Sequence, residues 1–282
     1  MIITFKNSND SIRIENCLIN DDFAIENFKF SDGTTLNYEE VKKLLVTKGT
    51  NGNDNITGSN ASEKIYGFGG DDTIDAGNGN DTIYGGAGND YITTFSGNDV
   101  IYGEDGNDYI FTYDGPNFID GGNGDDTIFT REGNDTIIGG KGNDALTDNF
   151  GGDELYIFNL GDGIDTIQDY LGNDKILFKD TVNTDNIAFF MNSNGYLYID
   201  YGKEAGQDVI QLNYQDSANY KIEMYEVETS SGESLFMSSD DINKLIQDMT
   251  AYASENDITI NSVQDVKQNA DLMNLVNSAW AA

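Results

Sequence analysis

The sequence predicts an all-β fold in which short parallel strands wind around one continuous core. Three observations predict it. A nine-residue pattern, G-G-x-G-x-D-x-U-x with U aliphatic, repeats from Gly49 to Tyr156. Its eighth position is aliphatic in every copy, and its sixth position carries Asp, Glu or Asn in every copy. A fixed period of this kind is typical of solenoids, in which each repeat packs on its neighbours.

The eighth position of the repeat supplies the expected core. Its members are Ile56, Ile65, Ile74, Ile83, Ile92, Ile101, Ile110, Ile119, Ile128, Ile137, Leu146 and Leu155. Each would sit at the centre of a three-residue strand with its side chain pointing inward. One repeat cannot bury its aliphatic residue, but stacked repeats share one apolar column. The formal net charge of −35 by itself favours a disordered chain, yet a disordered chain has no reason to keep this register.

The sixth position supplies the expected metal ligands. Its members are Asp54, Glu63, Asp72, Asp81, Asp90, Asp99, Asp108, Asn117, Asp126, Asp135, Asp144 and Asp153. If two repeats make one coil, acids 18 residues apart lie in adjacent turns, separated by roughly 4.8 Å. Such a column of carboxylates repels itself unless cations lie between its members. Carboxylate and carbonyl oxygens suit calcium, so the sequence predicts several bound calcium ions.

The repeats divide into two alternating sets. We call the turns that carry Asp54, Asp72, Asp90, Asp108, Asp126 and Asp144 the first edge, and those that carry Glu63, Asp81, Asp99, Asn117, Asp135 and Asp153 the second edge. From residue 94 onward the second edge has lost the Gly pair at positions 1 and 2, and Thr94, Thr112 and Thr130 take position 1. We therefore expect strong calcium sites on the first edge and weaker or missing sites on the second, weakest around Pro116 and Asn117.

A competing interpretation is an antiparallel meander with Asn-Gly and Asp-Gly hairpin turns. A period of nine leaves only about three residues per strand, which is short for a meander. The regular acid at the sixth position would also have no purpose there.

The flanks are expected to close the coil. After residue 156 the period breaks by three residues and resumes with Asp165 and Ile167, and then with Asp174 and Ile176. Strands at 187–191, 197–201 and 209–212 would cover the last coil. Two helices are expected beyond them, from Ser238 or Ser239 to about residue 252 and from Ser262 to about residue 280.

A strand, a hairpin and a short helix recur near both ends, in residues 9–45 and 207–246. We therefore expect four parts. They are a truncated β-β-α module at 1–48, the repeat coil at 49–177, a β-rich cap at 178–247 and a tail with a helix at 248–282. The incomplete first module suggests the C-terminal part of a longer protein.

Composition excludes several functions. There are 50 acidic and 15 basic residues, so no basic face is available for nucleic acid. There is no histidine, which removes Ser-His-Asp triads and most transition-metal sites. No apolar run approaches the roughly 20 residues that span a bilayer. No nucleophile, base or cofactor loop stands apart from the repeat, so an enzyme is not expected.

The nonapeptides 49–156, the block YIFNLGDGIDTIQDY (156–170) and the segment FSDGTTL resemble the haemolysin-type calcium-binding exoproteins, or RTX (repeats-in-toxin) proteins. The resemblance implies a right-handed parallel β-roll with flanking β-rich caps and short C-terminal helices. It also implies calcium held by the position 6 carboxylate and the carbonyls of positions 2 and 4. The metal residues expected on this basis are Asp54, Gly70, Asp72, Gly77, Gly79, Asp81, Gly86, Gly88, Asp90, Asp99, Gly106, Asp108, Gly122, Gly124, Asp126, Asp135, Gly140, Gly142, Asp144 and Asp153.

The resemblance further implies a secreted, toxin-related protein of Gram-negative bacteria. It would leave the cell through a type I secretion apparatus, with an uncleaved signal at about residues 240–282. Calcium outside the cell would then drive folding of a monomer. The alternative is an adhesin or ligand-binding surface of a larger RTX exoprotein that contacts a host cell through outward aromatic residues. These are Tyr66, Tyr84, Tyr91, Tyr102, Tyr109, Phe111, Phe118 and Phe129.

Overall fold

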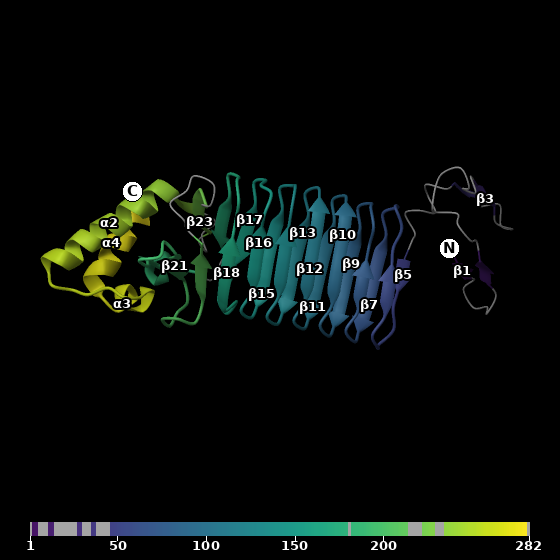
Figure 1. The fold of residues 1–282 in the computed structure, drawn as a ribbon, viewed down its shortest axis with the longest axis horizontal. Coiled ribbons are helices and arrows are strands. Elements are labelled where there is room, and N and C mark those ends of the chain that lie inside the picture. Colours follow the sequence, from purple (N-terminus) through teal and green to yellow (C-terminus); the bar gives the residue numbers. More distant parts are fainter. Residues whose placement is uncertain are drawn as a thin grey trace.

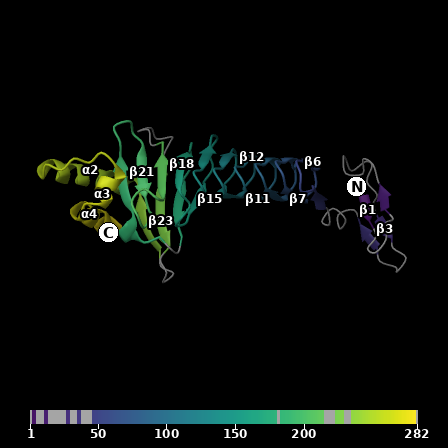
Figure 2. The ribbon, with the colours of Figure 1, turned by 90° about the horizontal axis from the view of Figure 1, so that it is seen from below.

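The protein is described by a computed structural model that covers residues 2–4, 11–13, 27–29, 35–37, 46–179, 182–213, 222–228 and 234–280. Its centre is a long coil of short parallel strands, with helices at the C-terminal end (Figure 1). Seen from below, the chain zigzags between two facing sheets (Figure 2). The predicted all-β parallel roll with few short helices is confirmed.

Two ten-stranded sheets build the roll. In order from the N-terminal end, the first sheet contains β5 (Val46–Lys48), β7 (Lys64–Gly69), β9 (Thr82–Ala87), β11 (Val100–Asp105), β13 (Phe118–Asn123), β15 (Thr136–Lys141), β17 (Leu155–Phe158), β19 (Lys175–Phe178), β23 (Met224–Glu228) and β24 (Ser234–Ser238). The second contains β6 (Asn55–Thr57), β8 (Thr73–Asp75), β10 (Tyr91–Ser96), β12 (Tyr109–Asp114), β14 (Thr127–Thr130), β16 (Ala145–Asp148), β18 (Ile164–Gln168), β22 (Val209–Leu212), β21 (Leu197–Asp200) and β20 (Ala188–Met191).

The pairing of each repeat with the next but one is confirmed by the strand register. Ile92 pairs with Ile74 on one side and with Ile110 on the other, and all three strands run parallel. Their side chains are fully buried, with 0% exposure. Burying one such side chain contributes about 1.5–3 kcal/mol. The stacked column therefore supplies the apolar core of the roll.

The register shifts by one residue at the twelfth repeat. The structure pairs Tyr156, and not Leu155, with Ile137. Tyr156 is fully buried, whereas Leu155 is only partly buried. The expectation that Leu155 points inward is therefore wrong. The turn before β17 is one residue longer than its predecessors, and side chains alternate along a strand, so one added residue exchanges the inward and outward sets.

The last coils continue into the predicted cap. The strand β22 pairs in parallel with β18, and β23 pairs in parallel with β19, so both sheets extend without a break. The antiparallel strands β20, β21 and β24 then finish the sheets. A short 3-10 helix, η2 (Thr184–Asn186), precedes β20.

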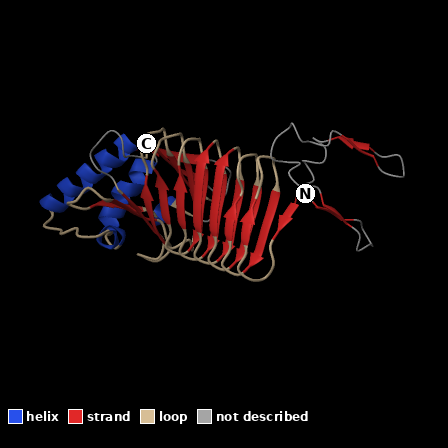
Figure 3. Ribbon diagram, turned by 45° about the vertical axis from the view of Figure 1, so that its right-hand side comes forward, coloured by secondary structure: helices blue, strands red, loops and turns tan. Residues whose placement is uncertain are grey.

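Three helices pack beyond these strands: α2 (Ser239–Glu255), α3 (Val263–Lys267) and α4 (Ala270–Trp280) (Figure 3). Ser238 and Ser262 cap α2 and α3 as expected. The helix α2 is continuous through residue 247, where the cap and the tail were expected to meet. The single helix expected from Ser262 is instead two, because Asn269 accepts the Asp271 and Leu272 N–H groups and starts a new helix.

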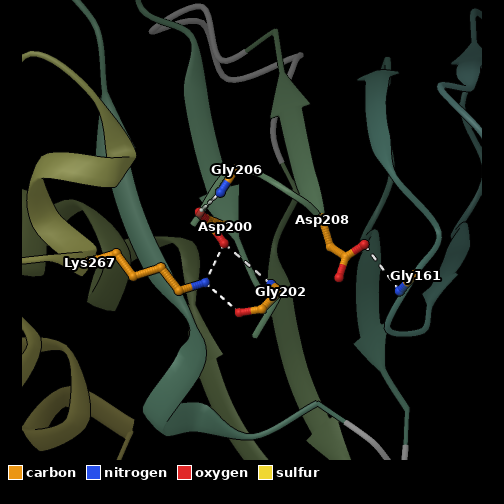
Figure 4. A network of polar contacts seen from close by, with 6 residues as sticks. All are labelled: Gly161, Asp200, Gly202, Gly206, Asp208 and Lys267. Atoms are coloured by element: carbon orange, nitrogen blue, oxygen red, sulfur yellow. Dashed lines mark hydrogen bonds and ion pairs between the residues drawn. The ribbon is translucent and has the colours of Figure 1, made fainter. Parts of the chain in front are cut away.

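A buried ion pair attaches the helices to the sheet. The Lys267 Nζ donates to Asp200 Oδ1 and, at 2.5 Å, to the Gly202 carbonyl (Figure 4). The Asp200 side chain is fully buried and also accepts the N–H groups of Gly202 and Gly206. Next to this network, Asp208 accepts the Gly161 N–H and so ties β22 to the turn before β18.

At the N-terminal end, β1 (Ile2–Thr4) pairs antiparallel with β2 (Ser11–Arg13), and β3 (Asn27–Lys29) pairs antiparallel with β4 (Thr35–Asn37). These strands match the expected strand and hairpin. The helix expected at 39–45 lies outside the described residues. Among the described helices, none is long and apolar enough to cross a membrane.

Candidate calcium-binding turns

The turns of the first edge stack in register along the roll. Each position 6 Asp accepts, through Oδ1, the backbone N–H of the equivalent residue in the coil before it. Asp90 receives the N–H of Asp72, and Asp108 receives that of Asp90, both at 2.8 Å. The same bond continues to Asp126, Asp144 and Asp165. Sheet pairing therefore fixes one oxygen of every inward carboxylate.

The second oxygen of each of these carboxylates has no hydrogen-bond donor. Asp72, Asp90, Asp108, Asp126, Asp144 and Asp165 are at most 2% exposed, and the Oδ2 atom of each is buried without a partner. A buried carboxylate oxygen is costly unless a donor or a cation satisfies it. A column of orphaned oxygens at one edge of the sheets fits calcium, which binds six to eight oxygen ligands.

Glycine at position 1 makes room for these oxygens. A Cβ built on Gly85 or Gly103 would overlap Oδ2 of Asp90 or Asp108 in the same turn. Gly67, Gly121 and Gly139 stand in the same relation to the acid of their own turn. Glycine at position 1, which has no side chain, therefore leaves space for the carboxylate of the same turn.

Position 2 of the first edge is held in the left-handed region of backbone space. Gly86, Gly122 and Gly140 have φ of 118°, 111° and 104°. Phe68 and Glu104 stand at the same position with φ of 79° each, although left-handed backbone costs a non-glycine residue about 1 kcal/mol or more. From the second copy onward the turn thus imposes one conformation, including on two copies that lack glycine there. Thr50, at position 2 of the first copy, does not share it. Position 4 is left-handed as well, in Gly70, Gly88, Gly106, Gly124 and Gly142.

Burial raises the pKa of the inward carboxyls. The pKa rises to about 6 in Asp90, about 7 in Asp108 and about 8 in Asp126, chiefly by desolvation. The N–H from the preceding coil opposes this rise in part, and neighbouring carboxylates add to it. These carboxyls would retain protons near neutral pH, and a divalent cation would displace them because it stabilises the ionised form.

The second edge has a different interior. Asp81, Asp99 and Asp135 are also buried with an unpartnered Oδ2. Position 1, however, carries Thr94, Thr112 and Thr130, all 0% exposed, where the first edge has glycine. The Thr94 hydroxyl lies close enough to Asp99 to offset part of the burial-driven rise in its pKa. Threonine side chains thus fill part of the space that is open on the first edge.

A stack of side chains also runs along the outside of the second edge. Phe95 stacks on Tyr113 with ring centroids 4.9 Å apart, and the Arg131 guanidinium lies 5.1 Å from the Tyr113 ring and 4.0 Å from that of Phe150. The residues that replace glycine at position 2 therefore contact one another from coil to coil. Such pairs stabilise neighbouring strands by a few tenths to about 1 kcal/mol each.

The outward aromatics of the sheets stack in the same way. Tyr66, Tyr84 and Tyr102 form a ladder with centroids 4.9 and 5.1 Å apart, and Tyr91 stacks on Tyr109 at 4.9 Å. Phe118, Phe111 and Phe129 join these ladders at tilted angles. These ring contacts run from coil to coil along the sheet.

Two expected metal residues differ in their surroundings from the others. Asp153 is exposed, and its Oδ1 accepts the N–H of Asn173. Because of the register shift, Glu154 takes the inward position of that coil. Asp54, in the first turn of the roll, is only partly buried, and its Oδ2 already accepts the backbone N–H and hydroxyl of Thr50. Of the expected residues, these two fit an inward ligand least.

Several inward acids lie outside the set of predicted metal residues. Asp165 and Asp174 were placed in register but not assigned as ligands, and both are buried with an orphaned Oδ2. The sequence indicates Asp148 and Asp169 less clearly, because neither stands at position 6 of the repeat. Asp148 takes the place of Thr130 in the next coil, because these two residues pair, and Asp169 follows one coil later.

Comparison with known families agrees with this geometry. The profile of the RTX calcium-binding nonapeptide repeat matches residues 48–83, 75–110 and 111–146. This chain is an RTX calcium-binding protein. The profile of the haemolysin-type calcium binding protein related domain matches residues 1–40 of this RTX protein. No curated protein matches the chain significantly. The RTX repeats bind calcium, their roll is a structural fold, and proteins that carry such repeats are typically secreted.

Proposed function

We propose that this RTX chain is a calcium-triggered folding module of a protein exported by a type I secretion system. The observation that carries the proposal is the row of buried, unpartnered Oδ2 atoms on the first edge, from Asp72 to Asp165. In the unfolded chain water solvates these oxygens. In the roll they are desolvated and lie close together, so only cations or protons make the folded state favourable.

Calcium binds the folded form alone, because the site takes its oxygens from successive coils. Position 6 carboxylates such as Asp90 and Asp108 would hold the ions together with the carbonyls of positions 2 and 4. A site of extracellular strength has a Kd of about 10⁻⁴–10⁻³ M. Each site contributes RT ln(1 + [L]/Kd), so several sites at millimolar calcium add a few kcal/mol in total. This is comparable to the stability of a small domain, roughly 5–15 kcal/mol.

The first edge would carry the stronger sites. Its position 1 glycines leave the Oδ2 atoms open, whereas Thr94, Thr112 and Thr130 occupy the equivalent space on the second edge. Asn117 supplies an amide in place of a carboxylate and donates to the Gly115 carbonyl at 2.8 Å. The second edge would therefore bind calcium weakly around residues 115–117.

Export would precede folding. The calcium concentration inside a cell is too low to fill sites of this strength, so the chain would stay unfolded and could pass a narrow channel. In this proposal residues 49–177 are the calcium-responsive roll and residues 178–247 its cap. The export signal lies in residues 240–282, and the folded protein acts outside the cell as a monomer.

Circular dichroism of the full chain tests calcium-triggered folding. In chelator we expect a spectrum of disordered chain, and in millimolar calcium a β-sheet spectrum. Asp108→Asn keeps the Oδ1 acceptor but removes the charge, so it should raise the calcium midpoint severalfold. Asp99→Asn on the second edge is the matched control and should shift it less. An unchanged, folded spectrum after exhaustive chelation would contradict the mechanism.

A secretion assay tests export. Deletion of residues 240–282 should abolish release by a type I system. The full chain with Lys267→Ala, which loosens the docked helices but keeps the segment, should still be released. Undiminished release of the truncated chain would refute the position of the signal.

A further inference from the structure

A cluster of four carboxylates lies where the second edge meets the cap. Asp148 and Glu154 belong to the turn between β16 and β17, and Asp169 and Asp174 to the next turn on the same edge, between β18 and β19. Asp148, Glu154 and Asp169 each place one carboxylate oxygen within 4.8 Å of the other two. The match to the family profile ends at residue 146, and an acid at position 1, such as Asp148, is not part of the repeat pattern.

The side chain of Glu154 is the least satisfied group of the cluster. It is 1% exposed, and neither Oε1 nor Oε2 has a hydrogen-bond partner. In the other coils an inward acid accepts an N–H from the preceding coil, but the longer side chain of Glu154 reaches past that position toward Asp148 and Asp169. A fully buried carboxylate with two unsatisfied oxygens among other carboxylates is among the most costly groups a fold can contain.

The remaining oxygens of the cluster are oriented by the protein. Asp148 Oδ2 accepts the N–H groups of Phe150 and Gly151, at 3.2 and 2.8 Å. Asp169 Oδ2 accepts the Tyr156 hydroxyl at 2.6 Å, and Asp174 Oδ1 accepts the Glu154 N–H at 2.9 Å. One oxygen of each of these three acids is thereby fixed, and the other, Oδ1 of Asp148 and Asp169 and Oδ2 of Asp174, is left without a donor.

Among the ion pairs of the described residues, none involves any of the four carboxylates. No positive side chain in this part of the chain therefore pairs with them. Burial followed by mutual repulsion raises the pKa of Glu154 to about 10 and that of Asp169 to about 9. The group thus needs either protons or a cation.

We propose that Asp148, Glu154 and Asp169, with Asp174 beside them, form a dedicated calcium site that fastens the last regular coil to the cap. Donors that are all carboxylate select a hard cation over zinc or copper. Four protein carboxylates also favour calcium over magnesium, which usually keeps several waters and binds one or two carboxylates. Unlike the repeat sites, this one is built from side chains at positions 1 and 6 of two successive turns.

A bound ion would link the last regular coil to the cap. The two linked turns lead into β17 and β19, and β19 pairs with the cap strand β23. An ion at this point would hold the last coil in the register that the cap requires. Because Thr94, Thr112 and Thr130 stand where Asp148 stands here, earlier turns of the second edge lack the extra charge. The site is therefore separate from the first-edge sites, and each can be lost without the other.

Native mass spectrometry of the full chain with calcium tests the site, using Glu154→Gln, Asp169→Asn and the double variant. The matched control is Asp153→Asn, which removes a neighbouring carboxylate that is exposed. We expect the double variant to bind one calcium ion fewer than the wild type and the control to bind the same number. We also expect a stability effect in calcium. Glu154→Gln should lower the unfolding temperature in saturating calcium, because the ion loses a ligand, whereas Asp153→Asn should leave it unchanged.

A double variant that binds as many ions as the wild type would overturn the proposal, since the cluster would then be a group of carboxyls that share protons. Equal ion counts with magnesium in place of calcium would overturn the choice of metal. A wild-type chain that binds no calcium at all would instead contradict the function proposed for the repeats.

Discussion

The Asp108 carboxylate occupies the space that a Cβ on Gly103 would fill. The two residues belong to one turn of the first edge, and the same relationship holds between Gly85 and Asp90 and between Gly121 and Asp126. Position 1 and position 6 of the repeat are therefore one steric unit. The regular spacing of glycine and acid in the repeat expresses a requirement for space as well as for backbone freedom.

Gly103→Ala tests this unit. Gly103 does not have a left-handed φ, so alanine adds no backbone strain, but its methyl would contact both the Asp108 carboxylate and the Gly121 carbonyl oxygen. The new methyl should displace the Asp108 carboxylate and raise the calcium midpoint about tenfold, equivalent to about 1.4 kcal/mol. Calcium titration followed by circular dichroism measures this. Thr112→Ala is the control, because its turn already accepts a Cβ, and it should leave the midpoint nearly unchanged. Equal shifts in both variants would contradict the steric argument.

Tyr156→Ala and Leu155→Ala test the register at the twelfth repeat. Tyr156 is fully buried and Leu155 partly exposed. Loss of a large buried side chain typically costs about 3–5 kcal/mol. We expect Tyr156→Ala to destabilise the calcium-bound protein by that amount and Leu155→Ala by less than half of it. Chemical denaturation in saturating calcium provides both values. The opposite ranking would indicate that the nine-residue register continues through the twelfth repeat without a shift.

Lys267→Ala tests how the helices are held. It would leave Asp200 buried and without its cation, which costs about 3–5 kcal/mol when a buried pair loses one partner. Hydrogen exchange should show faster opening of α3 and of the loop after β21. Lys244→Ala is the control, because its pair with Asp248 is exposed and worth at most about 0.5 kcal/mol. Equal protection of α3 in both variants would show that apolar contacts alone dock the helices.

The inward carboxyls predict opposite pH responses with and without calcium. The pKa of Asp126 is about 8 in the roll against 3.8 ordinarily. Between these values the folded chain binds the extra proton, so calcium-free stability is greatest below about pH 4 and lost as pH rises to about 8. Calcium needs the ionised carboxylate, so its affinity falls as pH is lowered through this window.

Circular dichroism and thermal unfolding from pH 8 to pH 5 measure these responses. In chelator the disordered chain should gain β-sheet signal as the pH falls, and in limiting calcium the unfolding temperature should fall. Asp126→Asn removes one titrating group and should flatten both slopes, which separates this effect from the general relief of net charge. Slopes of the same sign in both conditions would contradict the competition between protons and calcium.

The sequence by itself determined the roll. The aliphatic column from Ile56 to Leu146 and the 18-residue alternation marked by Thr94, Thr112 and Thr130 are periodic, and a period can be read without coordinates. The same periodicity identified the acids of the first edge. The structure adds to them the buried, orphaned Oδ2 atoms, because burial depends on how the coils stack.

Only the tertiary structure decided what happens where the period fails. One additional residue before β17 turned Glu154 inward and Asp153 outward, and a sequence pattern cannot say which side of an insertion keeps the register. The meeting of Asp148, Glu154 and Asp169 depends on one lengthened turn that stacks on a turn of ordinary length. No fixed spacing encodes that contact, because insertions shift the chain positions while sheet pairing restores the spatial ones.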